Sequence, residues 1–342
     1  MGLAAMLACG LGRAGEGEAA AAEEPEPDAA FTAVYTGESL NNVAGGIARG
    51  SVYVDNLDLQ AKFHGRPWGL PGVTAYIYFL YNNGAEFAAP YTGSLQGISN
   101  IEAVPSTRLY EAWLELPAPG GGTLRGGLYN LNTEFDSNEV GALFIAPEHG
   151  IGTEFAHTGL AGPSIFPVTS LALRYMRESG PWRLQAAILD AVPGDPLDSR
   201  RTYIHLGDGA LLVGEIGHTG DALKLAFGTW HYTTTLPDLL ATSPDGEPLQ
   251  HKGNGGAYAL ASHSFWSEAE SGRDVSAFVR YGIADSRVYQ TSDYLGLGVV
   301  AKGVLPGRPK DNLGLSLGLA GNGSEYRRAA ALAGAPADAA EW

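Results

Sequence analysis

The segment NLGLSLGL, residues 312–319, alternates leucine with asparagine, glycine, serine and glycine. Successive side chains of a β-strand point to opposite faces, so this period of two predicts a strand with one apolar and one small, polar face. Residues 108–116, 170–177 and 293–302 repeat the pattern, and in the first of these Tyr110 is assigned to the face opposite Glu111. Small and polar side chains fill a protein core poorly, so the second face is expected to contact water.

Working outward from this segment, the same period predicts about thirteen strands. They cover residues 31–39, 51–62, 73–82, 108–117, 123–131, 170–178, 182–190, 210–218, 222–235, 256–266, 274–285, 293–304 and 312–320. From the third strand onward, long connections (83–107, 132–169, 191–209, 236–255) alternate with short ones (118–122, 179–181, 219–221, 267–273). Tight turns at one end and long loops at the other are typical of a transmembrane antiparallel β-barrel, an all-β fold.

Composition excludes several other classes of protein. The chain has 21 basic and 37 acidic residues and a net charge of −16, which argues against binding a nucleic-acid backbone. Its one cysteine, Cys9, excludes a disulfide framework and a cysteine-based metal site. A G-x-S-x-G match at residues 314–318 lies inside an alternating strand and is not expected to be a hydrolase motif. No cofactor is indicated.

The chain divides into three parts. Residues 1–30 are interpreted as a signal-like apolar start followed by an acidic, flexible lead-in. Residues 31–321 form the predicted barrel. Residues 322–342 are polar and rich in alanine, and we interpret them as an incomplete C-terminal tail. Thirteen strands would end at the outer rim, whereas bacterial barrels have an even number, so closing strands are expected to be missing.

The connection at residues 132–167 is too long and too apolar for a surface linker. It is expected to fold into the barrel and narrow the pore. Its candidate constriction groups are Glu134, Asp136, Glu154 and His157. The histidines at 149 and 157 lack a close ligand pattern, so no metal site is predicted, although the carboxylates leave a hard cation such as calcium open.

Several blocks of sequence resemble one known family. They are YTGESL (35–40), QGISNIE (96–102), RLYEAWLE (108–115), GLYNLNTEF (127–135), HGIG (149–152), GPSIFP (162–167) and VPGDP (192–196). In this order they are similar to the carbohydrate-selective outer-membrane porins of the OprB type. The resemblance implies a sixteen-stranded barrel in the bacterial outer membrane, whose inward-folded loops form a constriction for sugars.

Strand parity identifies the side chains expected inside the barrel. They are Glu111, Trp113, Glu115, Arg125, Tyr129, Arg174, Arg183, Gln185, Glu215, Lys224, Trp230, Tyr232 and Arg280. Arginine and glutamate can bond sugar hydroxyls in pairs, and aromatic rings offer an apolar face to the C–H groups of a sugar ring. The alternative for any one of them is a structural role in which the charges pair around the wall.

The predicted function is passive diffusion of mono- or small oligosaccharides, without catalysis. The first rival is a secreted glycoside hydrolase that uses Glu111 and Glu115, but four residues along one strand separate them by roughly 13 Å, too far for either common mechanism. The second is a general or cation-preferring porin. The expected partners are small sugars and outer-membrane lipid. The sequence leaves the preferred sugar open, as it does the choice between monomer and homotrimer.

Overall fold

The computed structural model describes residues 27–194, 202, 204–268, 271–335 and 340–341. The interpretation of residues 1–30 as a signal-like lead-in therefore lies outside the described residues, apart from residues 27–30. None of the helices in the described ranges is long and apolar enough to cross a membrane.

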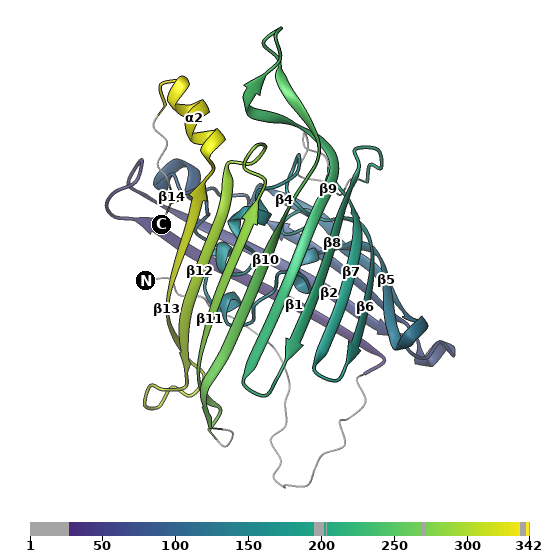
Figure 1. The fold of residues 1–342 in the computed structure, drawn as a ribbon. Helices are drawn as coiled ribbons and strands as arrows, with labels where there is room; N and C mark the ends of the chain where they lie inside the picture. Colours follow the sequence, from purple (N-terminus) through teal and green to yellow (C-terminus); the bar gives the residue numbers. More distant parts are fainter. Residues whose placement is uncertain (1–26, 195–201, 203, 269–270, 336–339, 342) are drawn as a thin grey trace.

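The described chain forms one antiparallel sheet in which each strand pairs with its neighbours in sequence (Figure 1). The strands are Ala29–Asn42 (β1), Gly50–His64 (β2), Thr74–Asn82 (β3), Ser106–Ala118 (β4), Gly122–Tyr129 (β5), Ser170–Ser179 (β6), Trp182–Asp190 (β7), Ala210–Thr219 (β8), Leu223–Thr242 (β9), Pro248–Glu268 (β10), Arg273–Ala284 (β11), Thr291–Lys302 (β12), Asn312–Asn322 (β13) and the two-residue Ala340–Glu341 (β14). Thirteen long strands confirm the all-β, antiparallel prediction.

In the part of the chain that the structure describes, helical structure is confined to the connections between strands. The α-helices are Thr153–Ala156 (α1) and Ser324–Leu332 (α2), and α2 lies in the polar, alanine-rich tail. Single turns occur at Arg66–Trp68 (η1), Ala88–Thr92 (η2), Pro119–Gly121 (η3), Leu131–Thr133 (η4), Gly141–Leu143 (η5) and Pro147–His149 (η6).

The two faces of the sheet have opposite chemistry, as the alternation predicts. Large apolar side chains stand exposed on the outer face, among them Leu114, Leu173, Leu184, Ile188, Leu212, Ile216, Phe227, Val279, Leu297 and Leu315. Leu315 is the extreme case, with 81% of its surface exposed. Such a band is unstable in water and suits a lipid environment.

One predicted loop is a strand extension instead. The long connection expected at 236–255 is a ribbon in which β9 and β10 continue above the other strands (Figure 1). It closes through Asp245 and Gly246, where Gly246 has a φ of 85° and the Ser243 N–H donates to the Glu247 carbonyl at 2.8 Å. An Asp-Gly pair is a strong signal for a β-hairpin, but the proline at 237 disfavours a strand on one side of it.

The parity assigned to Tyr110 is wrong. The sequence places Tyr110 opposite Glu111, but the register with β3 slips between Tyr78 and Phe79, so both side chains are buried on the inner side. A β-bulge leaves one residue unpaired and changes the parity of everything beyond it. Arg108 therefore also points inward and is 4% exposed.

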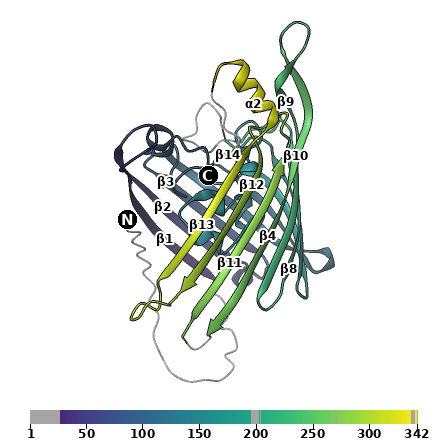
Figure 2. The same ribbon diagram turned by 60° about the vertical axis from the view of Figure 1, so that its left-hand side comes forward.

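Long and short connections separate to opposite ends of the sheet. The hairpin turns after β6 and β8 lie at the lower end in Figure 1, while the β9–β10 ribbon and α2 lie at the upper end. Seen from the side, β1 lies at one edge of the strongly curved sheet, and β13 with the two-residue β14 lies at the other (Figure 2). Within the described residues these edges are not paired with each other.

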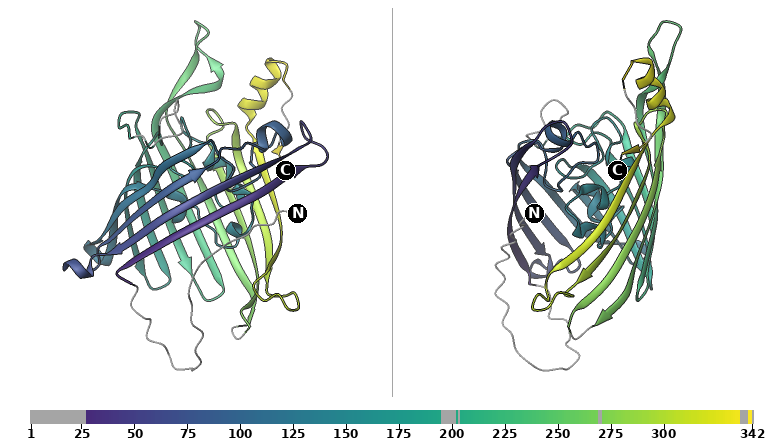
Figure 3. Two further views of the ribbon diagram at one scale, coloured as in Figure 1. Left: turned by 180° about the vertical axis from the view of Figure 1, so that it is seen from behind. Right: turned by 90° about the vertical axis from the view of Figure 1, so that its left-hand side faces the viewer.

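The connection between β5 and β6 lies in the interior of the curved sheet, between the β1 side and the β13 side (Figure 3). Its residues Leu131, Phe135 and Phe155 are each 0% exposed. They belong to a buried cluster with inner-face side chains of β7 to β10, including Leu189, Leu211, Val213, Trp230 and Tyr258. We call residues 130–169 the inward loop.

We expect Phe227→Arg to lower the free energy of unfolding in lipid vesicles by about 2–4 kcal/mol, because a charge would then sit on the lipid-facing band. Urea titration followed by tryptophan fluorescence measures the change. Thr242→Arg, on the projecting part of the same strand, is the matched control and should change stability by less than about 0.5 kcal/mol. Equal effects of the two changes would contradict a lipid-facing band.

Candidate functional site

Four charged groups meet where β4, β5 and β6 pass under the start of the inward loop. Glu115, Arg125 and Arg174 lie directly opposite one another across the three strands. Arg125 donates from Nε to Glu115 at 3.1 Å, and Arg174 reaches the same oxygen at 2.6 Å. Glu134, at the start of the loop, accepts from Arg174 at 2.6 and 2.7 Å and lies 3.2 Å from Arg125. The two carboxylates balance two arginines that would otherwise repel each other.

Trp113 fixes the position of Arg125. The guanidinium carbon of Arg125, on β5, lies 3.8 Å from the centroid of the Trp113 ring. Tyr76, on β3, stacks on the same ring with centroids 5.0 Å apart and planes inclined by 29°. The indole N–H donates to Glu111 at 3.2 Å. Because the flanking strands supply both ring contacts, Trp113 acts mainly as a support for the arginine.

A second group of contacts, formed by Asp136, holds the inward loop to the wall at β11. Both carboxylate oxygens of Asp136 accept from Nη2 of Arg280, at 2.6 and 2.7 Å, and both side chains are 0% exposed. The Asp136 N–H donates to Glu215 at 3.0 Å and to the Tyr258 hydroxyl at 3.1 Å. Asp136 has a φ of 51°, a left-handed conformation that aspartate tolerates better than most residues.

Glu154, on α1, lies beside this pair. Its Oε1 is 3.9 Å from Nη2 of Arg280, and it packs so closely on β11 that a Cβ at Gly282 would come within 1.8 Å of it. Burial raises the pKa of Glu154 to about 8. It also raises the pKa of Asp136, against the opposing effect of Arg280. At neutral pH this favours an ion pair of Asp136 with Arg280 beside a protonated Glu154.

The structure brings the parity-assigned residues to the inner side but exposes few of them. The inward loop covers Arg174, Glu215, Trp230, Tyr232 and Arg280, none of which is more than 7% exposed. Phe155, for example, stacks on Trp230 with ring planes 2° apart and centroids 4.9 Å apart. Direct contact with a solute is therefore not expected of these five side chains, whose partners are the loop and the wall.

Of the remaining candidates, six lie close together near Glu134 and three lie elsewhere. Trp113, Glu115, Arg125 and Glu134 are half-buried where the start of the inward loop meets β4 and β5, while Glu111 and Tyr129 are buried beside them, the Tyr129 hydroxyl donating to Glu134 at 2.5 Å.

Three candidates lie away from this group. Arg183 pairs with Glu178 at the β6–β7 turn, where both are about half exposed. Lys224 pairs with Glu139 at 2.6 Å, and His157 is exposed.

His149 is held in an aromatic pocket. Its ring packs edge-on against Phe144 and Phe278, and its Nδ1 lies 3.2 Å from the Tyr294 hydroxyl. Burial lowers its pKa to about 4, so it is neutral. Among the described residues no group of three or more His, Cys, Asp or Glu side chains is arranged to hold a metal ion.

Sequence reasoning missed the aromatic groups of β3. Tyr78 donates to Asp58 on β2 at 2.6 Å and packs edge-on against Tyr110 at 4.9 Å. With Tyr76 they line the inner side next to Trp113. The sequence of β3, TAYIYFLYN, is apolar or aromatic at nearly every position, so alternation alone could not tell its inner from its outer face.

We expect Glu134→Gln to loosen the start of the inward loop and to destabilise the protein by about 2 kcal/mol. The change leaves the buried Arg174 and the half-buried Arg125 with one carboxylate between them. Limited proteolysis, with cleavage sites mapped by mass spectrometry, should then show faster cutting within residues 130–169. Glu178→Gln, which removes an exposed pair, is the control. Unchanged proteolysis of both variants would contradict the role of Glu134 in holding the inward loop to Arg125 and Arg174.

The raised pKa of Glu154 predicts that stability falls as pH rises. The folded state binds this proton up to about pH 8, whereas the unfolded chain releases it near pH 4.5, so folding becomes less favourable across that interval. The lowered pKa of His149 acts in the opposite direction, but only between about pH 4 and 6.5. Between pH 6.5 and 8 the urea midpoint should therefore fall in the wild type and stay flatter in Glu154→Gln. Parallel curves would contradict a buried, protonated Glu154.

Comparison with known proteins agrees with this architecture. The model of the carbohydrate-selective porin family, OprB, matches residues 49–340. The high-pH structure of Pseudomonas putida OprB has a TM-score of 0.75 at 17% identity, covering 91% of this chain and 80% of that one. The low-pH structure of the same protein has a TM-score of 0.52 at 15% identity, covering 86% of this chain and 77% of that one.

A curated relative matches over a shorter range. Porin B of Pseudomonas aeruginosa is 29% identical over 97 residues, which is 26% of this chain and 21% of that protein's length. The match therefore spans about a fifth of that relative, and the two solved structures support the fold. Because the family model extends over most of the chain, this protein belongs to the OprB family of carbohydrate-selective porins.

Proposed function

We propose that this protein is a passive channel that admits mono- or small oligosaccharides to the periplasm and catalyses no reaction. The OprB family and the apolar outer face place it in the bacterial outer membrane. Outer-membrane lipid is the proposed partner of that face, and small sugars are the proposed solutes. A monomer and a homotrimer are both compatible with this proposal.

The observation that carries the proposal is the group formed by Trp113, Glu115, Arg125 and Glu134. Its guanidinium and carboxylates are held in place by one another and by the indole ring, yet the Arg125 and Glu115 side chains keep 13% and 19% of their surface exposed. Fixed donors beside fixed acceptors match sugar hydroxyls, which need both. Because each group already has a partner, a bound sugar gains little and can leave, as conduction requires.

We assign different roles to the loop residues. Glu134 is the proposed constriction group, since it joins the loop to the half-buried charges of β4 and β5. Asp136 and Glu154 are proposed to hold the loop against β11 rather than to meet the solute. His157, which is exposed, is proposed to face the approach to the pore.

A general or cation-preferring porin is the main alternative, given the net charge of −16. The lining argues against it, because Arg125 and Arg174 balance Glu115 and Glu134 where the loop meets the wall. A balanced lining presents no field of one sign to attract cations. Single-channel ion selectivity, recorded with and without sugars, separates the two functions.

A glycoside hydrolase receives little support from the geometry. The porin family and fold indicate a channel. Glu111 is 4% exposed and accepts from the Asn130 N–H at 3.0 Å, and Glu115 is bound by two arginines. Neither carboxylate is presented as a general acid or a nucleophile for a glycosidic bond. Hydrolysis of any glycan by the purified protein would overturn this part of the proposal.

Liposome swelling tests selectivity. We expect glucose to enter vesicles containing the protein faster than an amino acid of similar size, and a disaccharide to enter more slowly than glucose. Arg125→Ala should lower the rate of glucose entry severalfold, because it removes the fixed donors of the lining. Arg183→Ala is the matched control and should leave entry unchanged. Equal rates for all solutes of one size would leave only a general porin.

A further inference from the structure

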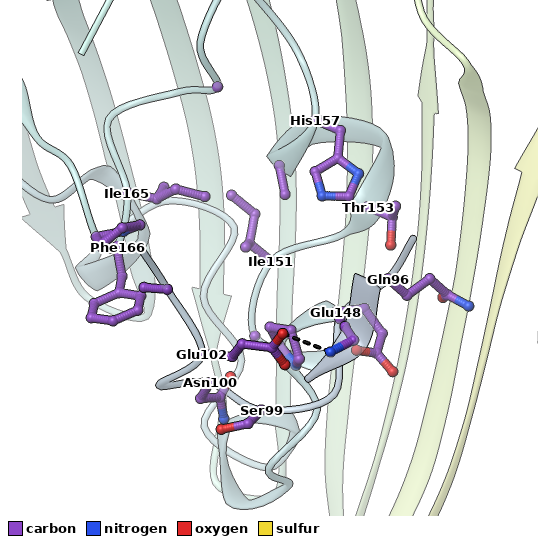
Figure 4. A pocket seen from close by; sticks show the side chains of 18 of the residues that line it. Gln96, Ser99, Asn100, Glu102, Glu148, Ile151, Thr153, His157, Ile165 and Phe166 are labelled. Carbon is purple, nitrogen blue, oxygen red and sulfur yellow. Dashed lines mark hydrogen bonds between the residues drawn. The ribbon is translucent and has the colours of Figure 1, made fainter. Parts of the chain in front are cut away.

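A second candidate site lies between the inward loop and the connection that joins β3 to β4. Residues from 86–104 and from 130–168 line an open cavity of about 570 Å³ (Figure 4). A hexose fits within this volume. The cavity is distinct from the charged group of β4 to β6, since neither Glu115 nor either of its arginines lines it.

Three of the sequence blocks that carry the family resemblance meet at this cavity. They are the blocks at 96–102, 149–152 and 162–167, which come from two different connections of the barrel. The charged lining described above makes no use of the first and third blocks. Their meeting place is therefore a feature that the proposed pore lining leaves without a role.

The carboxylate of Glu102 is held in position through one of its two oxygens. Its Oε1 accepts from the backbone N–H groups of Phe87 and Ala88, both at 2.7 Å. These two bonds fix the carboxylate, while its buried Oε2 has no hydrogen-bond partner among the described residues. Because the carboxylate is fixed, its Oε2 can accept a hydrogen bond from a ligand that donates one.

Thr153 adds a second unused group on the opposite loop. Its side chain lines the cavity, it is 2% exposed, and its Oγ1 has no partner within the described ranges (Figure 4). A buried hydroxyl left without a hydrogen bond is unfavourable. A ligand hydroxyl could satisfy it as donor or acceptor.

The other side of the cavity is apolar. Phe166 and Ile165 lie together on the side opposite Gln96 and Glu148, with Ile151 between (Figure 4). One apolar and one polar side match the two faces of a sugar, which has C–H groups and hydroxyls.

The charge of the lining narrows the choice of sugar. Of the described residues that line the cavity, Glu86, Glu102 and Glu148 are acidic, and none is lysine or arginine. A sugar acid or sugar phosphate would meet these carboxylates without a compensating cation.

We propose that this cavity is a binding site for neutral sugars on the long-loop side of the channel, and that it discriminates against anionic sugars. The inference rests on the proposed sugar-channel function and deepens it. A solute would bind here first and then pass to the charged group around Arg125. Glu102 and Thr153 supply the hydrogen bonds, and Phe166 supplies the apolar contact.

Single-channel recording of the full chain in planar bilayers tests the site. Glucose and glucuronate are added in turn to the side that carries the long loops, and dissociation constants are taken from blocking events. Glu102→Gln keeps an oxygen for the two N–H groups but replaces the free acceptor by a donor. We expect it to weaken glucose block about tenfold and to narrow the preference for glucose over glucuronate. Thr153→Val should weaken glucose block about threefold.

Controls separate this site from the rest of the channel. Both variants should still form conducting channels without sugar, which shows that they fold and open. Glu178→Gln removes a carboxylate at the opposite end and should leave the block unaltered. If Glu102→Gln forms no channels, Thr153→Val and the cavity-filling Ala161→Trp carry the test.

Two outcomes would overturn the proposal in different ways. Glucose block that is undiminished in Glu102→Gln, Thr153→Val and Ala161→Trp would reject the cavity and leave the sugar channel standing. A conducting wild-type channel that glucose blocks from neither side would reject both proposals together.

Discussion

The pairing of two loop carboxylates with arginines of the wall governs the interior of this barrel. Glu134 binds Arg125 and Arg174 on one side, and Asp136 binds Arg280 on the other. Removing such charges from water costs several kcal/mol for each ion, so the pairs add little net stability. The apolar packing of the loop on the wall supplies the stability, and the ion pairs set the register, because a shifted loop would leave buried charges without partners.

This register divides the inner surface into one part that the loop covers and one part that stays half-buried. Strands β7 to β10 are covered by the loop and behave as the core of an ordinary protein. On strands β3 to β5, Tyr76, Trp113 and Arg125 stay half-buried on the inner face. Selectivity can therefore depend on a few side chains although many point inward. Parity identifies the inner face, but only the position of the loop decides which inner residues can meet a solute.

The sequence predicted the fold better than the site, for physical reasons. Alternation with a period of two marks each strand independently, so thirteen strands could be recognised without knowing their neighbours. Tyr110 was misassigned because a bulge depends on pairing with β3, which no local pattern reveals. The anchor of Asp136 on Arg280 joins residues 144 positions apart, and the sequence shows both charges but not their contact. The resemblance identified the family, whereas roles for single residues can be proposed only when their contacts in the structure are known.

Balanced charge also makes the proposed passage of a neutral solute compatible with a strongly acidic protein. A neutral molecule gains nothing from net charge, but its hydroxyl dipoles respond to donors and acceptors that stand close together. In the group around Glu115 and Arg125 each charge has an opposite charge within about 3 Å, so the field is strong locally and weak a short distance away. A sugar at this proposed lining would exchange one set of hydrogen bonds for another at small net gain. That exchange favours passage, since a site that bound tightly would hold the solute and close the channel.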